Sequence, residues 1–114
     1  MLVAHEPLRA EEALWKAGTA KAVITPKEPL WMAGYAARTA PANGTLHDVY
    51  VRVLALEDAD GHRAVIVSTD LLGIPRSISQ NVCRALAAKF GLSRESIMLN
   101  ASHTHSGPVL RGAL

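Results

Sequence analysis

The fold of this chain is decided by residues 49–70, which read VYVRVLALEDADGHRAVIVSTD. Residues 49–57 alternate between two sets of side chains with the period of two that is typical of a β-strand. Residues 62–70 are rich in β-formers again, and the intervening DADG at residues 58–61 is a turn signal. The two runs are therefore expected to form an antiparallel hairpin. The second run is apolar on both faces at residues 64–67, which is typical of a central strand that is covered on both sides. One helix covers such a strand only in part, so a second covering layer is expected to be missing from this chain.

The segment after this hairpin predicts one crossover connection. Apolar residues recur at every fourth position over residues 78–90, which indicates an amphipathic helix, and Gly91 follows in the usual C′ position. Residues 97–101 (IMLNA) read as a last strand. A strand–helix–strand unit is almost always parallel and right-handed. Asp70 and His103 would then leave the carboxyl ends of parallel strands, where open α/β sheets bind their ligands.

Upstream of the hairpin, a first strand is expected over residues 17–25 (AGTAKAVIT), and Pro26 ends it because proline cannot donate to a β-ladder. A long loop follows over residues 27–48, and loops of this length in compact domains are usually functional or disordered. Its hydrophobic piece WMAGYA, at residues 31–36, is expected to pack against another part of the protein. The predicted fold class is α/β, with a mixed sheet of about four strands in the order β-β-β-α-β and one crossover helix, as part of a larger domain.

The composition is that of an ordinary globular chain, with 114 residues, 49% hydrophobic residues, 19% charged residues and a net charge of +2. A chain of this length is one domain at most. Its basic residues are spread along the sequence without interleaved aromatic residues, which argues against nucleic-acid binding. We find no transmembrane segment and no signal-peptide pattern, so a cytoplasmic location is the default expectation.

The residues that carry chemistry lie at positions 100–108, which read NASHTHSGP. His103 and His105 are two residues apart, so an extended backbone presents both imidazoles on one side. Imidazole is the commonest protein ligand for a transition metal, and imidazole with oxygen ligands and no thiolate suits zinc best. The alternative is an accidental pair among five histidines, with both rings structural. Asp70 either accepts backbone N–H bonds at a turn or orients one of the imidazoles through its second ring nitrogen.

Three segments taken together resemble the N-terminal part of the neutral/alkaline non-lysosomal ceramidase family: AGTAKAVITP at residues 17–26, MAGYA at 32–36 and ASHTHSGP at 101–108. The resemblance implies a zinc amidohydrolase that cleaves the N-acyl amide of ceramide, or of another N-acyl amide substrate, and from ceramide releases sphingosine and a fatty acid. It also implies a division of the chain into an N-terminal segment, residues 1–16, and part of the catalytic domain, residues 17–114. Family members are typically secreted or membrane-associated.

By this resemblance, His103 is the first zinc ligand, and His105 is a catalytic residue that hydrogen-bonds the substrate amide or the oxyanion formed from it. We expect His47, Gly34 and Tyr35 to bind substrate, with His47 reaching the site if the long loop folds over it. Family members complete the zinc site with a histidine, a glutamate and a tyrosine from much later in a longer domain. The isolated chain is therefore expected to be inactive, and a C-terminal polypeptide would complete the domain.

Two other interpretations stay open on the sequence alone. The first is a small non-enzymatic α/β module, whose sheet edge pairs with a partner and whose histidines are structural or bind metal adventitiously. The second is one half of a split hydrolase that a separate chain completes. Tight zinc binding that is lost in both His103→Ala and His105→Ala would argue against the module, and rescue on co-expression would identify the split enzyme.

Overall fold

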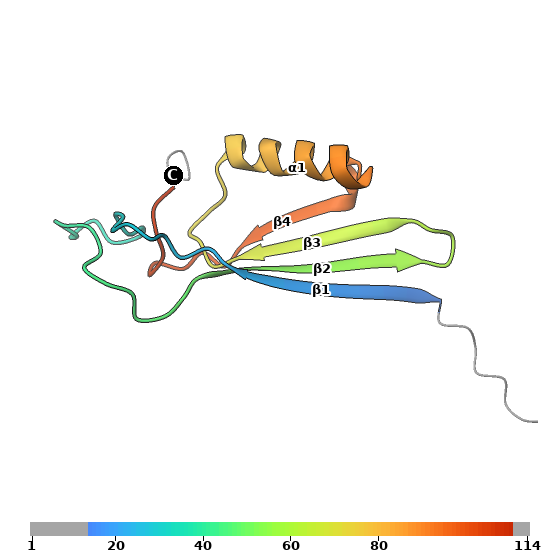
Figure 1. Ribbon diagram of the computed structural model, residues 1–114. Helices are drawn as coiled ribbons and strands as arrows, with labels where there is room; N and C mark the ends of the chain where they lie inside the picture. The colour runs from blue at the N-terminus through green and yellow to red at the C-terminus, as the bar shows by residue number, and fades with distance from the viewer. Residues whose placement is uncertain (1–13, 111–114) are drawn as a thin grey trace, which may run out of the picture.

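The computed structural model describes residues 14–110, which form one four-stranded sheet with a helix on one face (Figure 1). The strands follow one another across the sheet in the order β1-β2-β3-β4. The pairs β1–β2 and β2–β3 are antiparallel, whereas β3–β4 is parallel. The predicted α/β class, with a mixed sheet and one crossover helix, is therefore confirmed. The elements are β1 (Trp15–Val23), β2 (Tyr50–Asp58), β3 (Arg63–Thr69), α1 (Arg76–Phe90), a 3-10 turn (Arg94–Ser96) and β4 (Ile97–Ala101).

The first strand begins and ends two residues earlier than the pattern predicts. It ends before Thr25 because the hydroxyl of that residue bonds to the far end of the long loop. Its hydroxyl donates to Oδ1 of Asp48 at 2.7 Å and accepts the backbone N–H of Val49 at 3.0 Å. Thr25 precedes the loop and Asp48 ends it, so these two bonds hold the ends of the loop together. The loop thereby leaves and rejoins the sheet at one point.

The helix α1 begins directly after Pro75, whose φ of −58° and ψ of 146° are those of an extended N-cap residue. It ends at Gly91, which adopts a left-handed φ of 65° and donates its N–H to the carbonyl oxygen of Ala87. The predicted C′ glycine is confirmed. The helix buries a small core on one face of the sheet, made by Val65, Val67, Leu92 and Ile97 with Cys83 and Leu86 packed against it.

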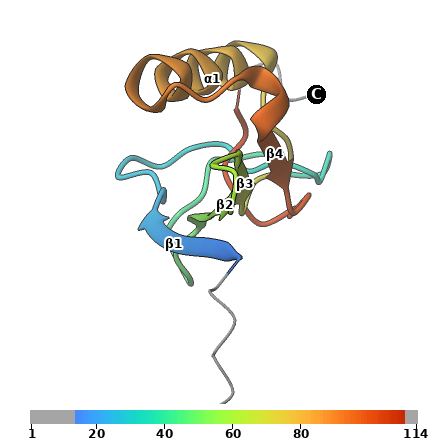
Figure 2. The same cartoon turned by 90° about the vertical axis from the view of Figure 1, so that its right-hand side faces the viewer.

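The opposite face of the sheet, which we call the open face, is not covered by any helix in the described part of the chain (Figure 2). Ile66 and Met98 pair across β3 and β4 on this face and are 36% and 60% exposed. Within residues 14–110 the doubly apolar third strand is therefore covered on one face only, as expected when a single helix packs on it. Val65 and Val67 lie beneath α1, but a single helix shields only one face.

The parallel pair β3–β4 fixes where the chemistry-bearing residues lie. Thr69 and Ala101 are paired at the ends of the two strands, and the N–H of Ser102 donates to the carbonyl oxygen of Thr69 at 2.9 Å. Asp70 and His103 consequently leave the sheet at the same edge, as the crossover pattern predicts. Separately, within the described residues no helix combines the length and the apolar character that crossing a bilayer requires.

Candidate functional site

Two segments far apart in the sequence pair with each other beyond the carboxyl ends of β3 and β4. We call residues 31–38 the Gly-Tyr loop and residues 102–109 the histidine turn. The N–H of Ala33 donates to the carbonyl oxygen of Gly107 at 3.0 Å, and that of Val109 donates to the carbonyl oxygen of Trp31 at 2.7 Å. Ala33 is 2% exposed. The expectation that this hydrophobic piece packs against another part of the protein is thus confirmed.

The imidazole of His103 is oriented by the crossover connection between β3 and α1. Its Nδ1 lies 2.9 Å from the carbonyl oxygen of Leu72, a residue that is only 6% exposed. A carbonyl oxygen only accepts hydrogen bonds, so Nδ1 carries the proton and the lone pair of the neutral ring lies on Nε2. The backbone of His103 is left-handed, with a φ of 59°, which is costly for a residue with a Cβ. A strained backbone and a braced ring are typical of a functional residue.

The imidazole of His105 packs against the Gly-Tyr loop. A Cβ built on Gly34 would lie 2.3 Å from Cγ of His105, so only glycine permits the observed approach. The rings of Tyr35 and His105 meet edge to face with their centroids 5.3 Å apart. The rings of His103 and His105 are also 5.3 Å apart, at an interplanar angle of 62°. The structure therefore brings together four of the five residues to which the family resemblance assigns a role.

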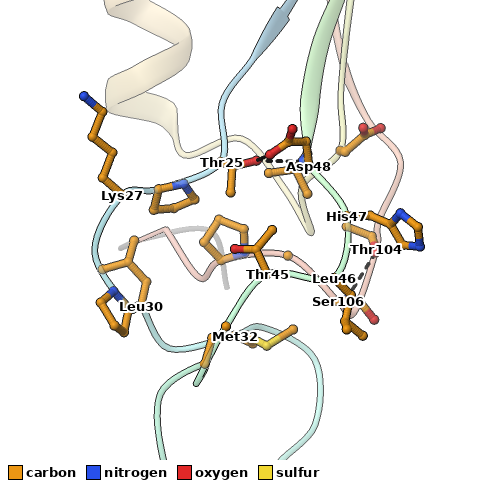
Figure 3. A pocket seen from close by; sticks show the side chains of 18 of the residues that line it. Thr25, Lys27, Leu30, Met32, Thr45, Leu46, His47, Asp48, Thr104 and Ser106 are labelled. Carbon is orange, nitrogen blue, oxygen red and sulfur yellow. Dashed lines mark hydrogen bonds between the residues drawn. The ribbon is translucent and has the colours of Figure 1, made fainter.

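His47 is the fifth residue, and it lies elsewhere. It is exposed and lines a cavity of about 750 Å³ between the long loop and the histidine turn (Figure 3). The histidine turn contributes Ser102, Thr104 and Ser106 to this cavity, and neither of its imidazoles. The hydroxyls and the imidazoles of this turn therefore lie on different sides of it. The structure does not place His47 beside the histidine pair.

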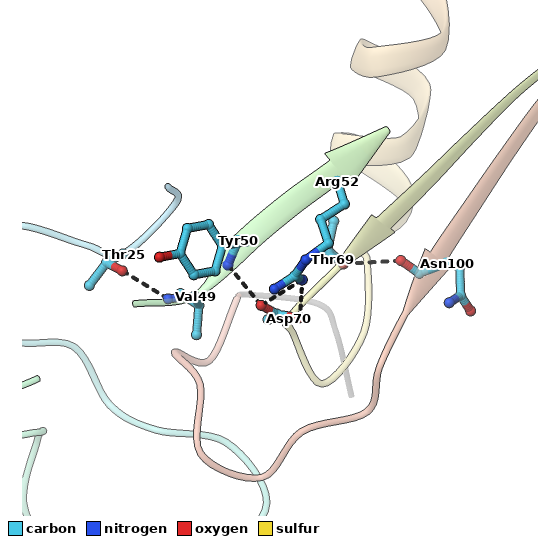
Figure 4. Close-up of polar contacts among 7 residues, drawn as sticks. All are labelled: Thr25, Val49, Tyr50, Arg52, Thr69, Asp70 and Asn100. Atoms are coloured by element: carbon cyan, nitrogen blue, oxygen red, sulfur yellow. Dashed lines mark hydrogen bonds and ion pairs between the residues drawn. The ribbon is translucent and has the colours of Figure 1, made fainter. Parts of the chain in front are cut away.

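Asp70 lies at the end of β3 and bonds to the start of β2 (Figure 4). It accepts the backbone N–H of Tyr50 at 3.0 Å and the guanidinium of Arg52 at 2.8 and 2.9 Å. The hydrogen bond from Arg52 holds the pKa of the Asp70 carboxyl below its ordinary value of 3.8. Of the two roles that the sequence leaves open, the structure supports the backbone-binding one, since the Nδ1 of His103 bonds to Leu72 instead.

Sequence reasoning missed one residue of the site, Arg38. Its guanidinium donates to the carbonyl oxygens of Ala33 and His105 and lies over the ring of Tyr35. Nothing in a single sequence marks an arginine in a loop as a donor to two distant carbonyls. The only feature that points to it is its position three residues after Tyr35, just beyond the hydrophobic piece at residues 31–36.

One group of three metal-ligating side chains occurs within residues 14–110, and it lies away from the histidine pair. It comprises Asp58, Asp60 and His62 in the β2–β3 turn. The carboxylate of Asp58 accepts the backbone N–H groups of Asp60 and His62 at 3.0 and 2.8 Å, and it lies 3.0 Å from the ring of His62. These hydrogen bonds stabilise the hairpin turn, which explains why the three side chains lie together. In the described part of the chain, His103 and His105 have no third ligand grouped with them.

Comparison with known proteins gives matches over nearly the whole chain. The family model described as "Neutral/alkaline non-lysosomal ceramidase, N-terminal" matches residues 15–111. The chain is 35% identical over 112 residues to the neutral ceramidase of Pseudomonas aeruginosa, an alignment that covers 95% of this chain and 17% of that protein. It is 31% identical over 103 residues to neutral ceramidase A of Dictyostelium discoideum, covering 87% of this chain and 14% of that protein.

Solved structures give the same result. The crystal structure of the P. aeruginosa neutral ceramidase superimposes with a TM-score of 0.79 at 34% identity, over 87% of this chain and 16% of that one. A structure described as a ceramidase complexed with C2 superimposes with a TM-score of 0.72 at 34% identity, over 83% of this chain and 15% of that one. The chain thus spans less than a fifth of the length of the relatives that it matches.

Proposed function

Because this chain belongs to the neutral/alkaline non-lysosomal ceramidase family, whose N-terminal part it matches, we propose that it is the N-terminal portion of a zinc-dependent amidohydrolase. The substrate is ceramide or a related N-acyl amide, and the products from ceramide are sphingosine and a fatty acid. The observation that carries the proposal is the histidine pair. Two imidazoles 5.3 Å apart lie at the carboxyl ends of parallel strands, one braced by Leu72 and the other by Gly34.

The donor set fits one side of a zinc site. Nδ1 of His103 is engaged by the carbonyl oxygen of Leu72, so Nε2 is the ring atom available to a metal. When bound, zinc supplies a Lewis acid that lowers the pKa of a water and polarises the amide carbonyl. A zinc site needs at least three protein ligands. Within residues 14–110, no third metal-ligating side chain is grouped with His103 and His105. We propose that the remaining ligands come from a C-terminal polypeptide of the longer domain.

The role of His105 in this proposal is to donate a hydrogen bond. Its ring is held between Gly34 and Tyr35, so it is oriented before substrate arrives. A ring N–H can then donate to the amide oxygen, on which negative charge develops as the carbonyl is attacked. A preorganised donor of this kind contributes about 2.7–4 kcal/mol to transition-state stabilisation.

Substrate contacts are assigned to the surfaces on either side of the histidine turn. Tyr35 is 59% exposed beside His105 and offers its ring and hydroxyl to a substrate held there. Gly34, which has no side chain, keeps the loop backbone close to the His105 ring. His47 lies across the turn in the large cavity, so it is proposed to contact a part of the substrate remote from the amide.

The isolated chain is proposed to be inactive. His103 and His105 alone hold zinc weakly, since catalytic zinc sites use three protein ligands. Purified chain is therefore expected to release no fatty acid from ceramide. Release that disappears in His103→Ala would contradict this part of the proposal.

A chimera tests the activity itself. Residues 15–111 would replace the matching N-terminal segment of the P. aeruginosa neutral ceramidase, and hydrolysis of a fluorescent short-chain ceramide would be measured together with bound zinc. We expect hydrolysis by the chimera, loss of zinc and activity in His103→Ala, and a fall in kcat of about 10²–10³-fold in His105→Ala. The matched control is His62→Ala in the β2–β3 turn, which should leave both readouts unchanged. A folded chimera that is equally active with His103→Ala would refute the zinc role.

A further inference from the structure

Arg38 joins the Gly-Tyr loop to the backbone of His105. Its Nη1 donates to the carbonyl oxygen of Ala33, and its Nη2 donates to the carbonyl oxygen of His105 at 3.0 Å. Its guanidinium carbon lies 4.7 Å from the centroid of the Tyr35 ring. One side chain therefore connects two segments that are 67 residues apart in sequence.

The planar guanidinium suits this position. It carries its donors in a rigid fork, so Nη1 and Nη2 of Arg38 can serve two carbonyls in one plane while the face of the group lies on an aromatic ring. The side chain is half-buried, and hydrogen bonds from a charged donor are stronger where water is partly excluded. The loop also turns back on itself here, since the N–H of Arg38 donates to the carbonyl oxygen of Tyr35 at 3.2 Å.

The two segments are joined elsewhere by backbone hydrogen bonds. The N–H groups of Ala33 and Val109 bond to the carbonyl oxygens of Gly107 and Trp31. These bonds lie after His105 in the histidine turn and do not involve its own backbone. The bond from Arg38 reaches the carbonyl oxygen of His105 itself. It therefore fixes the residue whose ring orientation matters for the proposed chemistry.

We propose that Arg38 is a positioning residue, which holds the Gly-Tyr loop against His105 so that the imidazole keeps its place beside Gly34 and Tyr35. The significance of that orientation for catalysis rests on the function proposed above. The positioning of His105 by Arg38 does not rest on that function, since it is defined by contacts within this chain. Its test can therefore be made without activity.

The test is an NMR comparison of the 114-residue chain with its Arg38→Ala variant. The ring protons of His105 should move toward their random-coil shifts, because they leave the ring-current field of Tyr35. The amides of Ala33 and Val109 should exchange with solvent about tenfold faster or more, as expected when a charge-assisted hydrogen bond is lost. The amide of Ile24, which bonds to Val49 where the ends of the long loop meet, should keep its protection.

Arg76→Ala, at the exposed start of α1, is the matched control and should change none of these signals. Arg38→Lys is a second, milder variant. Lysine keeps the charge but not the planar fork, so exchange at Ala33 and Val109 should lie between wild type and Arg38→Ala. The proposal is overturned if both variants fold and leave the His105 shifts and the two amide rates at their wild-type values.

The catalytic consequence is read in the chimera described above. Arg38→Ala should lower kcat with little change in KM, because it disturbs a donor used in the transition state more than it disturbs binding. A chimera that is inactive with Arg38 in place speaks against the proposed function, while the NMR comparison still decides whether Arg38 positions His105. An NMR effect together with an unchanged kcat would refute the catalytic significance alone.

Discussion

Gly34 and His105 approach each other so closely that the identity of one fixes the place of the other. A Cβ on Gly34 would lie 2.3 Å from Cγ and 2.6 Å from Nδ1 of His105, well inside van der Waals contact. The φ of Gly34 is 96°, a value that side-chain-bearing residues rarely adopt. Space and backbone conformation thus both require glycine. Gly34, which lies in a loop, therefore packs directly against the imidazole of His105, a candidate catalytic residue.

Replacing Gly34 by alanine should therefore disturb His105 as well as the loop. We expect Gly34→Ala to lower the free energy of unfolding by about 1–3 kcal/mol and to shift the ring protons of His105. Gly44→Ala is the control, because nothing lies within 4 Å of a Cβ built there, and it should be neutral. Urea unfolding and NMR check both variants. Equal stability of the two would show that the contact is not tight in solution.

His103 should be found as a single tautomer when its ring is neutral. Its Nδ1 lies 2.9 Å from the carbonyl oxygen of Leu72, which can only accept, so the proton belongs on Nδ1. Long-range ¹⁵N–¹H correlation spectra of the chain at a pH above the titration of its histidines distinguish the two tautomers. A ring protonated on Nε2 instead would mean that the Leu72 bond is not made and that Nε2 is not free for a metal.

The ion pair between Arg52 and Asp70 should make the protein sensitive to acid. Because the hydrogen bond from Arg52 lowers the pKa of Asp70 below 3.8, the folded state binds this proton less readily than the unfolded chain does. The stabilisation is therefore fully present well above the ordinary pKa of 3.8 and is lost as the pH falls through the lowered value.

Asp70→Asn should reduce the free energy of unfolding by about 1–2 kcal/mol at pH 7, a figure moderated by partial exposure of the pair. It should have a smaller effect in acid well below the ordinary pKa of 3.8, where the native carboxyl is itself becoming protonated. Urea titrations at the two pH values provide the measurement. Asp60→Asn, in the exposed β2–β3 turn, is the control. An identical loss at both pH values would indicate that shape rather than charge is responsible.

The fold was predictable where a periodic pattern encodes it directly. The alternation in residues 49–57 predicts β2 because a strand has a period of two, and the strand–helix–strand order predicts that Asp70 and His103 share one edge of the sheet. Coverage of Ile66 is not encoded in this direct way. An apolar residue shows that a face favours burial, but coverage depends on whether a second layer is present, and residues 14–110 supply one helix only.

The site was predictable in part. The sequence places the rings of His103 and His105 together, and they do lie 5.3 Å apart, but the backbone at His103 is left-handed rather than extended. His47 and Arg38 show where this reasoning ends. Their positions depend on the path of an irregular loop. The hydrogen bond between Thr25 and Asp48 and the pairing with the histidine turn set this path, and no periodic sequence pattern encodes it. Contacts that close a loop over a large sequence separation leave no regular trace in one sequence.

The neighbours Ile97 and Met98 should differ sharply in their response to truncation, because β4 directs them to opposite faces of the sheet. Ile97 is 4% exposed beneath α1, whereas Met98 is 60% exposed on the open face. Ile97→Ala should lower the free energy of unfolding by about 2–4 kcal/mol. Met98→Ala should change it by no more than about 0.5 kcal/mol. Urea unfolding of the isolated chain at two protein concentrations checks both. A large cost for Met98→Ala that grows with concentration would show that a second copy covers the open face in solution.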